Sequence, residues 1–141
     1  MSSAGELPAR SVTKAVAIDR APEKVFAFLA DAANWPRWAV VNVLDVAKDD
    51  EPDWWRMETP RGPGRLRIAA EAERGLLDHE FVSEEAHWHV PARVVANGRG
   101  ALFMMTFFQP KGFSDPFFDQ QIALVDRELD TLKSILEGST P

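Results

Sequence analysis

The hydrophobic and polar positions divide the chain into a strand, a short helix, a series of strands and a long final helix. Ser11 to Asp19 carries β-branched residues at alternate positions, which predicts a strand. Pro22 predicts the start of a helix of about ten residues, because the first helical residue needs no N–H donor. Apolar residues at i, i+3 and i+4 give this helix one buried side. Asn34 to Trp38 ends it, with a short second helical turn expected after Pro36.

From Val41 to Gln109, short β-rich segments alternate with turn signals, a pattern typical of an antiparallel meander. The turns divide this region into six expected strands. The turns are expected at Asp49 to Pro52, Pro60 to Pro63, Arg74-Gly75, Ser83 to Ala86 and Asn97 to Gly100.

A long amphipathic helix is predicted to follow. Asp115 and Pro116 signal its start and Gly138 its end. Between them, apolar residues recur at spacings of three and four, at Phe118, Ile122, Val125, Leu129, Leu132 and Leu136. Such a stripe needs an equally long apolar surface, and the concave face of the sheet can supply it. We therefore predict an α+β fold in which a curved antiparallel sheet of about seven strands wraps around this helix, with one or two short helices after the first strand.

Length and charge fit one globular domain. The chain has 141 residues, and a domain of this size buries about 70% of the surface of its unfolded chain. We expect a single domain over 11–138, with flexible ends at 1–10 and 139–141. Sixteen basic and 22 acidic residues give a formal charge of −6 without long runs of one sign, which argues against a nucleic-acid partner.

Composition excludes several kinds of chemistry. The chain contains no Cys and no Tyr, so disulfides, thiolate nucleophiles and phenolic acids or bases are excluded. No apolar stretch is long enough to span a membrane, and the first ten residues lack the apolar region of a secretory signal. We therefore expect no membrane partner, a cytoplasmic location and no cofactor.

Three segments of the chain resemble a known family. Residues 13–38 contain the pattern AP..VF.FL.D..NWPRW, residues 90–98 read VPARVVANG, and residues 125–138 read VDRELDTLKSILEG. With the order of elements, they resemble the START-like helix-grip superfamily (SRPBCC), in its polyketide cyclase/dehydratase-like branch. The resemblance implies a helix-grip fold with a deep cavity for apolar or amphipathic small molecules. The superfamily includes cyclases, hormone and lipid carriers and activators of chaperone ATPases, so the resemblance indicates the fold more narrowly than the function.

Turn lengths predict which strand residues lie opposite one another. A two-residue turn at positions 74 and 75 places Ala70 opposite His79, and a four-residue loop at 83–86 places Phe81 opposite Trp88. The other expected pairs are Met57 with Leu66, Val46 with Trp55, and Val94 with Ala101. Pro91 cannot donate a ladder hydrogen bond and indicates a bulge, which would exchange the faces of Trp88 and His89.

This register predicts the walls of a ligand cavity. The expected ligand-binding side chains are Asn42, Trp55, Met57, Thr59, Ala70, Phe81, Trp88, Phe103, Met105, Gln121 and Val125. Leu44 is also expected to face inward. Trp35 and Trp38 are expected to close one end of the sheet, and the loop from Arg61 to Gly64 is a candidate gate at the mouth.

His79 is the candidate catalytic residue. It is predicted in the middle of a strand on the apolar face, with small side chains near it, and an imidazole can transfer protons near neutral pH. The alternative is a buried histidine that is satisfied by a backbone carbonyl. His87 and His89 have the spacing of a zinc-binding pair, but they are predicted to face outward, with Glu80 opposite His89. We therefore expect no metal site unless a bulge at Pro91 brings the three histidines together.

Three classes of function remain open at this point. The first is a protein that binds a hydrophobic or aromatic small molecule. The second is a polyketide cyclase/dehydratase-type enzyme with His79 as general base, although the predicted register puts no carboxylate in the cavity to assist it. The third is an interaction module that acts through its sheet surface. Binding is the function we favour.

The last predicted strand suggests a homodimer. Leu102, Met104 and Phe108, with Val95, are apolar on the face predicted to be exposed, where polar residues are usual. We expect two copies to pack through this patch. The alternative is a register shifted by one residue, which would bury these side chains and expose Phe103, Met105 and Phe107 instead.

Overall fold

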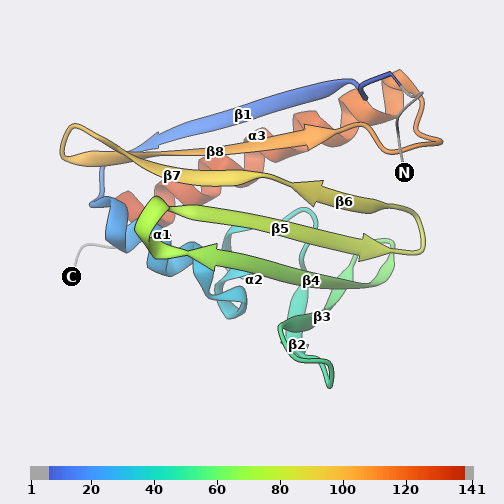
Figure 1. The fold of residues 1–141 in the computed structure, drawn as a ribbon, viewed down its shortest axis with the longest axis horizontal. Coiled ribbons are helices and arrows are strands. Elements are labelled where there is room, and N and C mark those ends of the chain that lie inside the picture. Colours follow the sequence, from blue (N-terminus) through green and yellow to red (C-terminus); the bar gives the residue numbers. More distant parts are fainter. Residues whose placement is uncertain (1–6, 139–141) are drawn as a thin grey trace.

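An antiparallel sheet of eight strands curves around a long helix in the computed structural model, which describes residues 7–138 (Figure 1). Most of the ends expected to be flexible, 1–6 and 139–141, lie outside the described residues. The strands are β1 Ser11–Ile18, β2 Asp45–Lys48, β3 Trp54–Thr59, β4 Gly62–Glu71, β5 Leu76–Ser83, β6 His87–Val90, β7 Ala92–Asn97 and β8 Gly100–Phe108. The α-helices are α1 Pro22–Ala30, α2 Trp35–Trp38 and α3 Asp115–Gly138, and short 3-10 turns cover Ala32–Asn34 and Ala72–Arg74.

The strand order is β1-β8-β7-β5-β4-β3-β2, and β6 pairs with β5. Every pair is antiparallel. The α3 helix runs behind the sheet in Figure 1, α1 lies near the end of the sheet where the chain leaves β1, and α2 lies nearer the middle of the sheet. This is the α+β helix-grip architecture expected from the sequence, with eight strands because Pro91 separates β6 from β7.

Within residues 7–138, no helix is both long and apolar enough to pass through a membrane.

The β4–β5 hairpin has a longer connection than we expected. Glu71 pairs with Leu76, so four residues connect the strands, and Ala70 lies opposite Leu77 instead of His79. His79 pairs with Ile68. The connection requires glycine at position 75, because its φ is +69° and a Cβ atom there would lie 2.2 Å from the carbonyl oxygen of Val94.

Three other hairpins also differ from the expected register by two residues. Met57 pairs with Gly64 and not Leu66, Val46 with Met57 and not Trp55, and Val94 with Phe103 and not Ala101. The β3–β4 turn consists of two residues, 60 and 61, where a four-residue loop was expected. The β7–β8 turn lies at 98–99, one residue later than expected. Because side chains alternate with a period of two, an error of two residues leaves each side chain on its predicted face.

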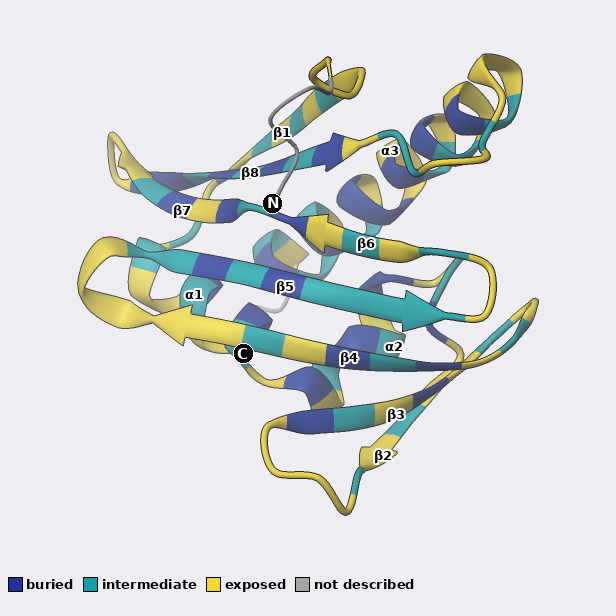
Figure 2. Cartoon of the chain, turned by 45° about the vertical axis from the view of Figure 1, so that its right-hand side comes forward, coloured by how far each residue is buried: buried dark blue, intermediate teal, exposed yellow. Residues whose placement is uncertain are grey.

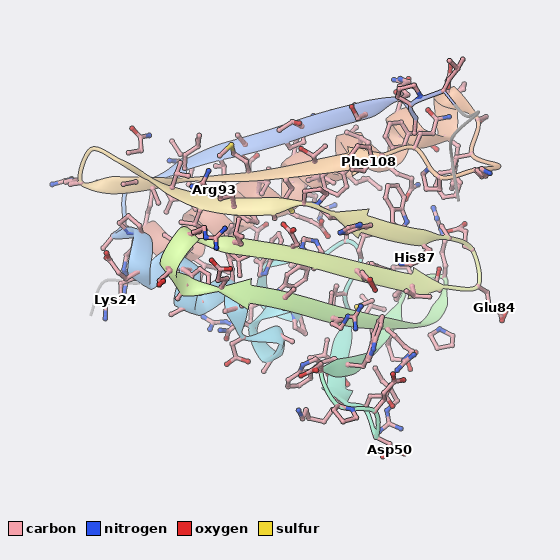
Figure 3. The ribbon with its side chains drawn as sticks, viewed as in Figure 1. Lys24, Asp50, Glu84, His87, Arg93 and Phe108 are labelled. Atoms are coloured by element: carbon pink, nitrogen blue, oxygen red, sulfur yellow. The ribbon has the colours of Figure 1, made fainter. Side chains whose placement is uncertain are left out.

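The side chains of β8 therefore lie on the faces that the unshifted register predicts. Phe103, Met105 and Phe107 are buried, whereas Phe108 is exposed and lies at the end of the strand in Figure 3. The register shifted by one residue is wrong. Pro91 likewise leaves the faces unchanged, because His79 pairs with Val90 and Leu76 with Arg93 in one continuous register.

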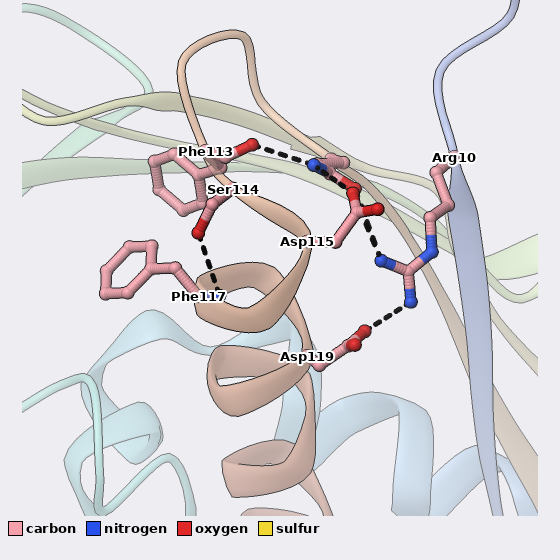
Figure 4. Close-up of polar contacts among 7 residues, drawn as sticks. Arg10, Phe113, Ser114, Asp115, Phe117 and Asp119 are labelled. Carbon is pink, nitrogen blue, oxygen red and sulfur yellow. Dashed lines mark hydrogen bonds and ion pairs between the residues drawn. The ribbon is translucent and has the colours of Figure 1, made fainter.

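The α3 helix is fastened to β1 along one side of the sheet. Arg10, just before β1, forms ion pairs with Asp115 and Asp119 in the first turns of α3 (Figure 4). Lys14 pairs with Asp126 at 3.1 Å. Ser114 caps the helix, since its Oγ accepts a hydrogen bond from the backbone N–H of Phe117 at 3.2 Å. These contacts hold α3 close to β1.

Candidate functional site

A pocket of about 520 Å³ lies between α3, α2 and the inner side of β5, β6 and β8. Its floor and walls are mainly apolar, and they include Trp35, Trp38, Val43, Phe81, Trp88, Val90, Phe107 and Ile122. The burial map in Figure 2 shows buried segments on β5, β8 and α3, the elements that face this space.

Most of the side chains expected at the cavity lie at this pocket. They are Asn42, Thr59, His79, Phe81, Trp88, Met105, Gln121 and Val125. Four others lie outside its lining. Met57 and Phe103 are packed in the core, Trp55 is half-buried with the Lys48 ammonium 5.3 Å from its ring centroid, and Ala70 is exposed near the end of β4. Leu44 is also exposed, at 56%, so its expected inward position is wrong.

His79 is buried in the pocket wall as a neutral imidazole. Its Nδ1 lies 3.0 Å from the carbonyl oxygen of Leu77, and because that oxygen can only accept, Nδ1 carries the proton and Nε2 keeps its lone pair. The ring packs edge-on against Trp35 with centroids 4.9 Å apart. Burial lowers the pKa of His79 to about 4, so the ring stays uncharged at neutral pH.

Glu128, on the inner side of α3, is a pocket residue that we did not expect. It is only 5% exposed, and its Oε2 accepts hydrogen bonds from the backbone N–H groups of Val41 and Asn42, at 3.1 and 3.0 Å. The side-chain amide of Asn42 donates a third hydrogen bond at 3.2 Å. Burial raises the pKa of Glu128 to about 7 despite these donors. The pocket therefore contains a carboxyl group that titrates near neutral pH.

The sequence did contain a signal for Glu128. It lies three residues after Val125 and four residues before Leu132, so helical spacing places it on the buried side of α3. A stripe defined by apolar residues alone omits Glu128, because its side chain is polar. The expectation that no carboxylate enters the pocket is wrong, because it considered strand residues and not the helix.

Trp35 and Trp38 form the wall next to α2. The indole N–H of Trp35 donates to the carbonyl oxygen of Leu29 at 2.9 Å. The indole Nε1 of Trp38 is buried and has no hydrogen-bond partner among residues 7–138. Both rings border the pocket, so they do more than close one end of the sheet.

Arg61 lies at the mouth of the pocket, in the β3–β4 turn. Its guanidinium forms an ion pair of 2.7 Å with Glu85 in the β5–β6 loop and lies 5.0 Å from the ring centroid of Phe117 on α3. The neighbouring Glu84 marks this end of the sheet in Figure 3. The Thr59 hydroxyl is used by the turn itself, since it donates to the carbonyl oxygen of Gly62 and accepts from the N–H of Arg61. Arg61 thus connects three elements around the mouth.

Histidines on the outer face remain apart from His79. His87 and His89 are exposed, and His87 lies on the outward side of β6 in Figure 3. Glu80 pairs with His89 in the ladder as predicted and lies 3.8 Å from His87 Nε2. Within residues 7–138, no group of three or more His, Asp or Glu side chains is arranged to hold a metal ion.

Comparison with known proteins places this architecture in a family. Residues 9–137 match the family model described as polyketide cyclase / dehydrase and lipid transport. A comparison with curated proteins gave no match.

Several solved structures share the fold. A START superfamily protein from Mycobacterium smegmatis has a TM-score of 0.71 at 15% identity, covering 92% of this chain and 99% of that chain. The Aha1 dimer from Colwellia psychrerythraea gives 0.72 at 12% identity, with 91% and 96% covered. The di-domain ARO/CYC BexL from the BE-7585A biosynthetic pathway gives 0.70 at 17% identity, with 88% and 45% covered. At these identities the likeness concerns the fold alone.

The family model spans nearly the whole chain, and the eight-stranded sheet around α3 agrees with it. The chain belongs to the polyketide cyclase/dehydrase and lipid transport family, and it has the helix-grip fold.

Proposed function

We propose that the protein binds a hydrophobic or aromatic small molecule in the pocket between the sheet and α3. The observation that carries this proposal is the pocket itself, about 520 Å³ with a mainly apolar lining. Small-molecule sites are usually concave, mostly apolar and about 300–1,000 Å³, with a few polar groups that orient the ligand. His79 Nε2 and the Glu128 carboxyl are such groups.

Aromatic side chains support binding at the end of the pocket near the start of α3. Trp88 stacks on Phe118 with centroids 6.2 Å apart and contacts Phe107 and Phe113 edge-on. Of these rings, Trp88 and Phe107 line the pocket and offer an apolar surface to a ligand. The family description, which includes lipid transport, agrees with a ligand of this kind.

Titration with the neutral fluorescent dye Nile red tests the proposal. We expect saturable binding of one dye per chain. Val90→Phe, on the pocket wall opposite His79, should fill part of the space and weaken binding. Val82→Phe makes the same change on the same sheet but at a position outside the pocket lining, and it should bind the dye as the wild type does.

Two results would contradict the proposal. One is a wild-type protein that does not bind the dye. The other is equal binding by the wild type and a folded Val90→Phe variant, because the dye would then occupy another surface. Circular dichroism of both variants checks that they are folded.

The carboxyl group of Glu128 favours a second candidate, a cyclase/dehydratase-type enzyme. Enolate chemistry needs a base and a second polar group, and the pocket contains a neutral His79 and a carboxyl with its pKa near 7. Exchange of the α-hydrogens of a bound methyl ketone with D₂O, followed by NMR, tests this chemistry. The protein should accelerate the exchange, and His79→Ala should abolish the acceleration. An undiminished rate in that variant would exclude His79 as the base.

A homodimer through the outer face of β7 and β8 remains part of the proposal. Val95 and Leu102 are paired neighbours on this face, and Met104 lies next to them opposite Ala15 of β1. A solved structure with the same fold is described as a dimer. The cytoplasmic location stays a prediction.

A further inference from the structure

The pocket has an unbalanced negative charge. The titratable side chains at its lining are Arg61, His79, Glu84, Glu85 and Glu128. Arg61 is paired with Glu85 at the mouth, and His79 is neutral. Among the pocket residues within 7–138, no cationic side chain is therefore available to Glu128.

The two oxygens of Glu128 differ in their surroundings. Within residues 7–138, Oε2 accepts all three hydrogen bonds that the Glu128 side chain makes, and they come from Val41 and Asn42. Oε1 has no partner within residues 7–138, yet it is not sealed from solvent as Trp38 Nε1 is. Because Glu128 lines the pocket and is 5% exposed, Oε1 opens into the pocket. A buried carboxylate oxygen without a partner is unfavourable unless a ligand donor or cation satisfies it.

We propose that the ligand is a hydrophobic amine, whose ammonium group binds Oε1 of Glu128 while its apolar part fills the end of the pocket lined by Trp88 and Phe107. This inference rests on the proposed small-molecule binding and adds the chemical class of the ligand. An ammonium supplies the missing positive charge and donates a hydrogen bond to the free oxygen. A carboxylate of the same length meets an uncompensated negative charge instead, which opposes its binding.

The hydrogen bonds to Oε2 give the site a fixed geometry. Two of the three donors are backbone N–H groups of the segment after α2, so the carboxyl is held before any ligand arrives. A held group loses less entropy on binding than a free surface side chain does. The raised pKa of Glu128 agrees with this account, because burial raises it and no nearby cation offsets that effect.

Three ligands with the same alkyl chain test the inference: decylamine, decanol and decanoate, measured by displacement of Nile red and by calorimetry at pH 8. We expect decylamine to bind about tenfold more tightly than decanol, and decanoate to bind most weakly. In Glu128→Gln the preference for the amine over decanol should disappear, because the variant lacks the negative charge that binds the ammonium. The amide keeps an oxygen that can accept from Val41 and Asn42.

Asp130→Asn is the matched control. Asp130 is an exposed residue of α3, two positions from Glu128 and outside the pocket lining, and the substitution removes the same charge. This variant should keep the amine preference of the wild type. Calorimetry at pH 7 in two buffers of different ionisation enthalpy should also show that decylamine binding releases protons, because an ammonium lowers the pKa of Glu128. Glu128→Gln should release none.

The outcomes separate this inference from the proposed function. If decanol and decanoate bind as tightly as decylamine, the pocket binds hydrophobic molecules and the amine inference is wrong. If Glu128→Gln and Asp130→Asn lose the preference for decylamine equally, the preference arises from the overall charge of the protein, and the inference is wrong. If none of the three ligands binds, both the inference and the proposed function are wrong.

Discussion

Glu128 and Asn42 are joined twice: the Oε2 atom of Glu128 accepts from the backbone N–H of Asn42 at 3.0 Å and from its side-chain amide at 3.2 Å. The two residues are 86 positions apart in the chain. Their contact fixes the segment after α2 against the middle of α3, on the side of the helix away from β1. The pocket is therefore bounded by a helix that is held on both sides, by ion pairs to β1 and by this carboxyl.

The stability of the protein should depend on pH through Glu128. Its pKa is about 7 in the folded protein, against an ordinary value of 4.5 for glutamate, so between these pH values the folded state binds more protons than the unfolded state. The free energy of unfolding contributed by this group is present below pH 4.5 and is lost as pH rises towards 7. Glu128→Gln should gain stability relative to the wild type over this window, by up to about 3 kcal/mol.

Urea denaturation of both proteins at several pH values measures this difference. His79 acts in the opposite direction, because its lowered pKa makes stability rise with pH from about 4 to 6.5. Both proteins contain His79, so its contribution cancels in the difference. A difference that does not change between pH 4.5 and 8 would contradict the buried position of Glu128.

His79 should contribute to ligand binding, unlike the histidines of the outer face. His79→Phe keeps the ring contact with Trp35 but removes the lone pair of Nε2, so decanol should bind about fivefold more weakly. His89→Phe makes the same change on the outer face of β6 and should have no effect. Equal losses of affinity in the two variants would indicate that His79 does not contact the ligand.

Two leucines of α3 should respond differently to truncation. Leu132 is fully buried, and Leu132→Ala should lower the free energy of unfolding by about 2–5 kcal/mol because it creates a new cavity. Leu124 is half-buried and borders space that already exists, so Leu124→Ala should lower it by less than about 1 kcal/mol. Thermal or urea unfolding measures both variants. If the two lose similar free energy of unfolding, side chains fill the pocket in solution.

Met104→Glu should convert the proposed dimer into a folded monomer, because a carboxylate in an apolar patch opposes packing of the two copies. Ala69→Glu, on the outer side of β4 and far from this patch in the strand order, is the control and should remain a dimer. Sedimentation equilibrium measures both. A monomeric wild type would overturn the dimer.

The sequence predicted the elements of the fold well, because their signals are local. Pro22, Asp115 and Gly138 mark helix ends that the structure reproduces within a residue or two. The β5–β6 pairing of Phe81 with Trp88 was also right, since its four-residue loop has the length that the sequence indicates. The other hairpins were wrong by two residues because turn conformation, such as the left-handed Gly75, decides the length of a connection.

The site was harder to predict than the fold. Alternation found His79 and much of the strand lining, because an error of two residues preserves the face. It could not find Glu128, whose role depends on the approach of α3 to the segment after α2. The contact joins residues that are far apart in the chain, so no local pattern predicts it. The sequence signal for it is a polar residue within the apolar stripe of a helix.

The position of Arg61 has a kinetic consequence. We expect that a ligand of the proposed kind, if it enters between the β3–β4 turn, the β5–β6 loop and α3, separates Arg61 from Glu85 on entering and again on leaving. The ion pair is therefore expected to raise the free-energy barrier to both entry and exit without increasing the affinity for the ligand. Salt screens an exposed pair of this kind, so higher ionic strength speeds uptake and escape together. We therefore expect the residence time of the proposed ligand to be set at the surface, separately from its affinity for the interior.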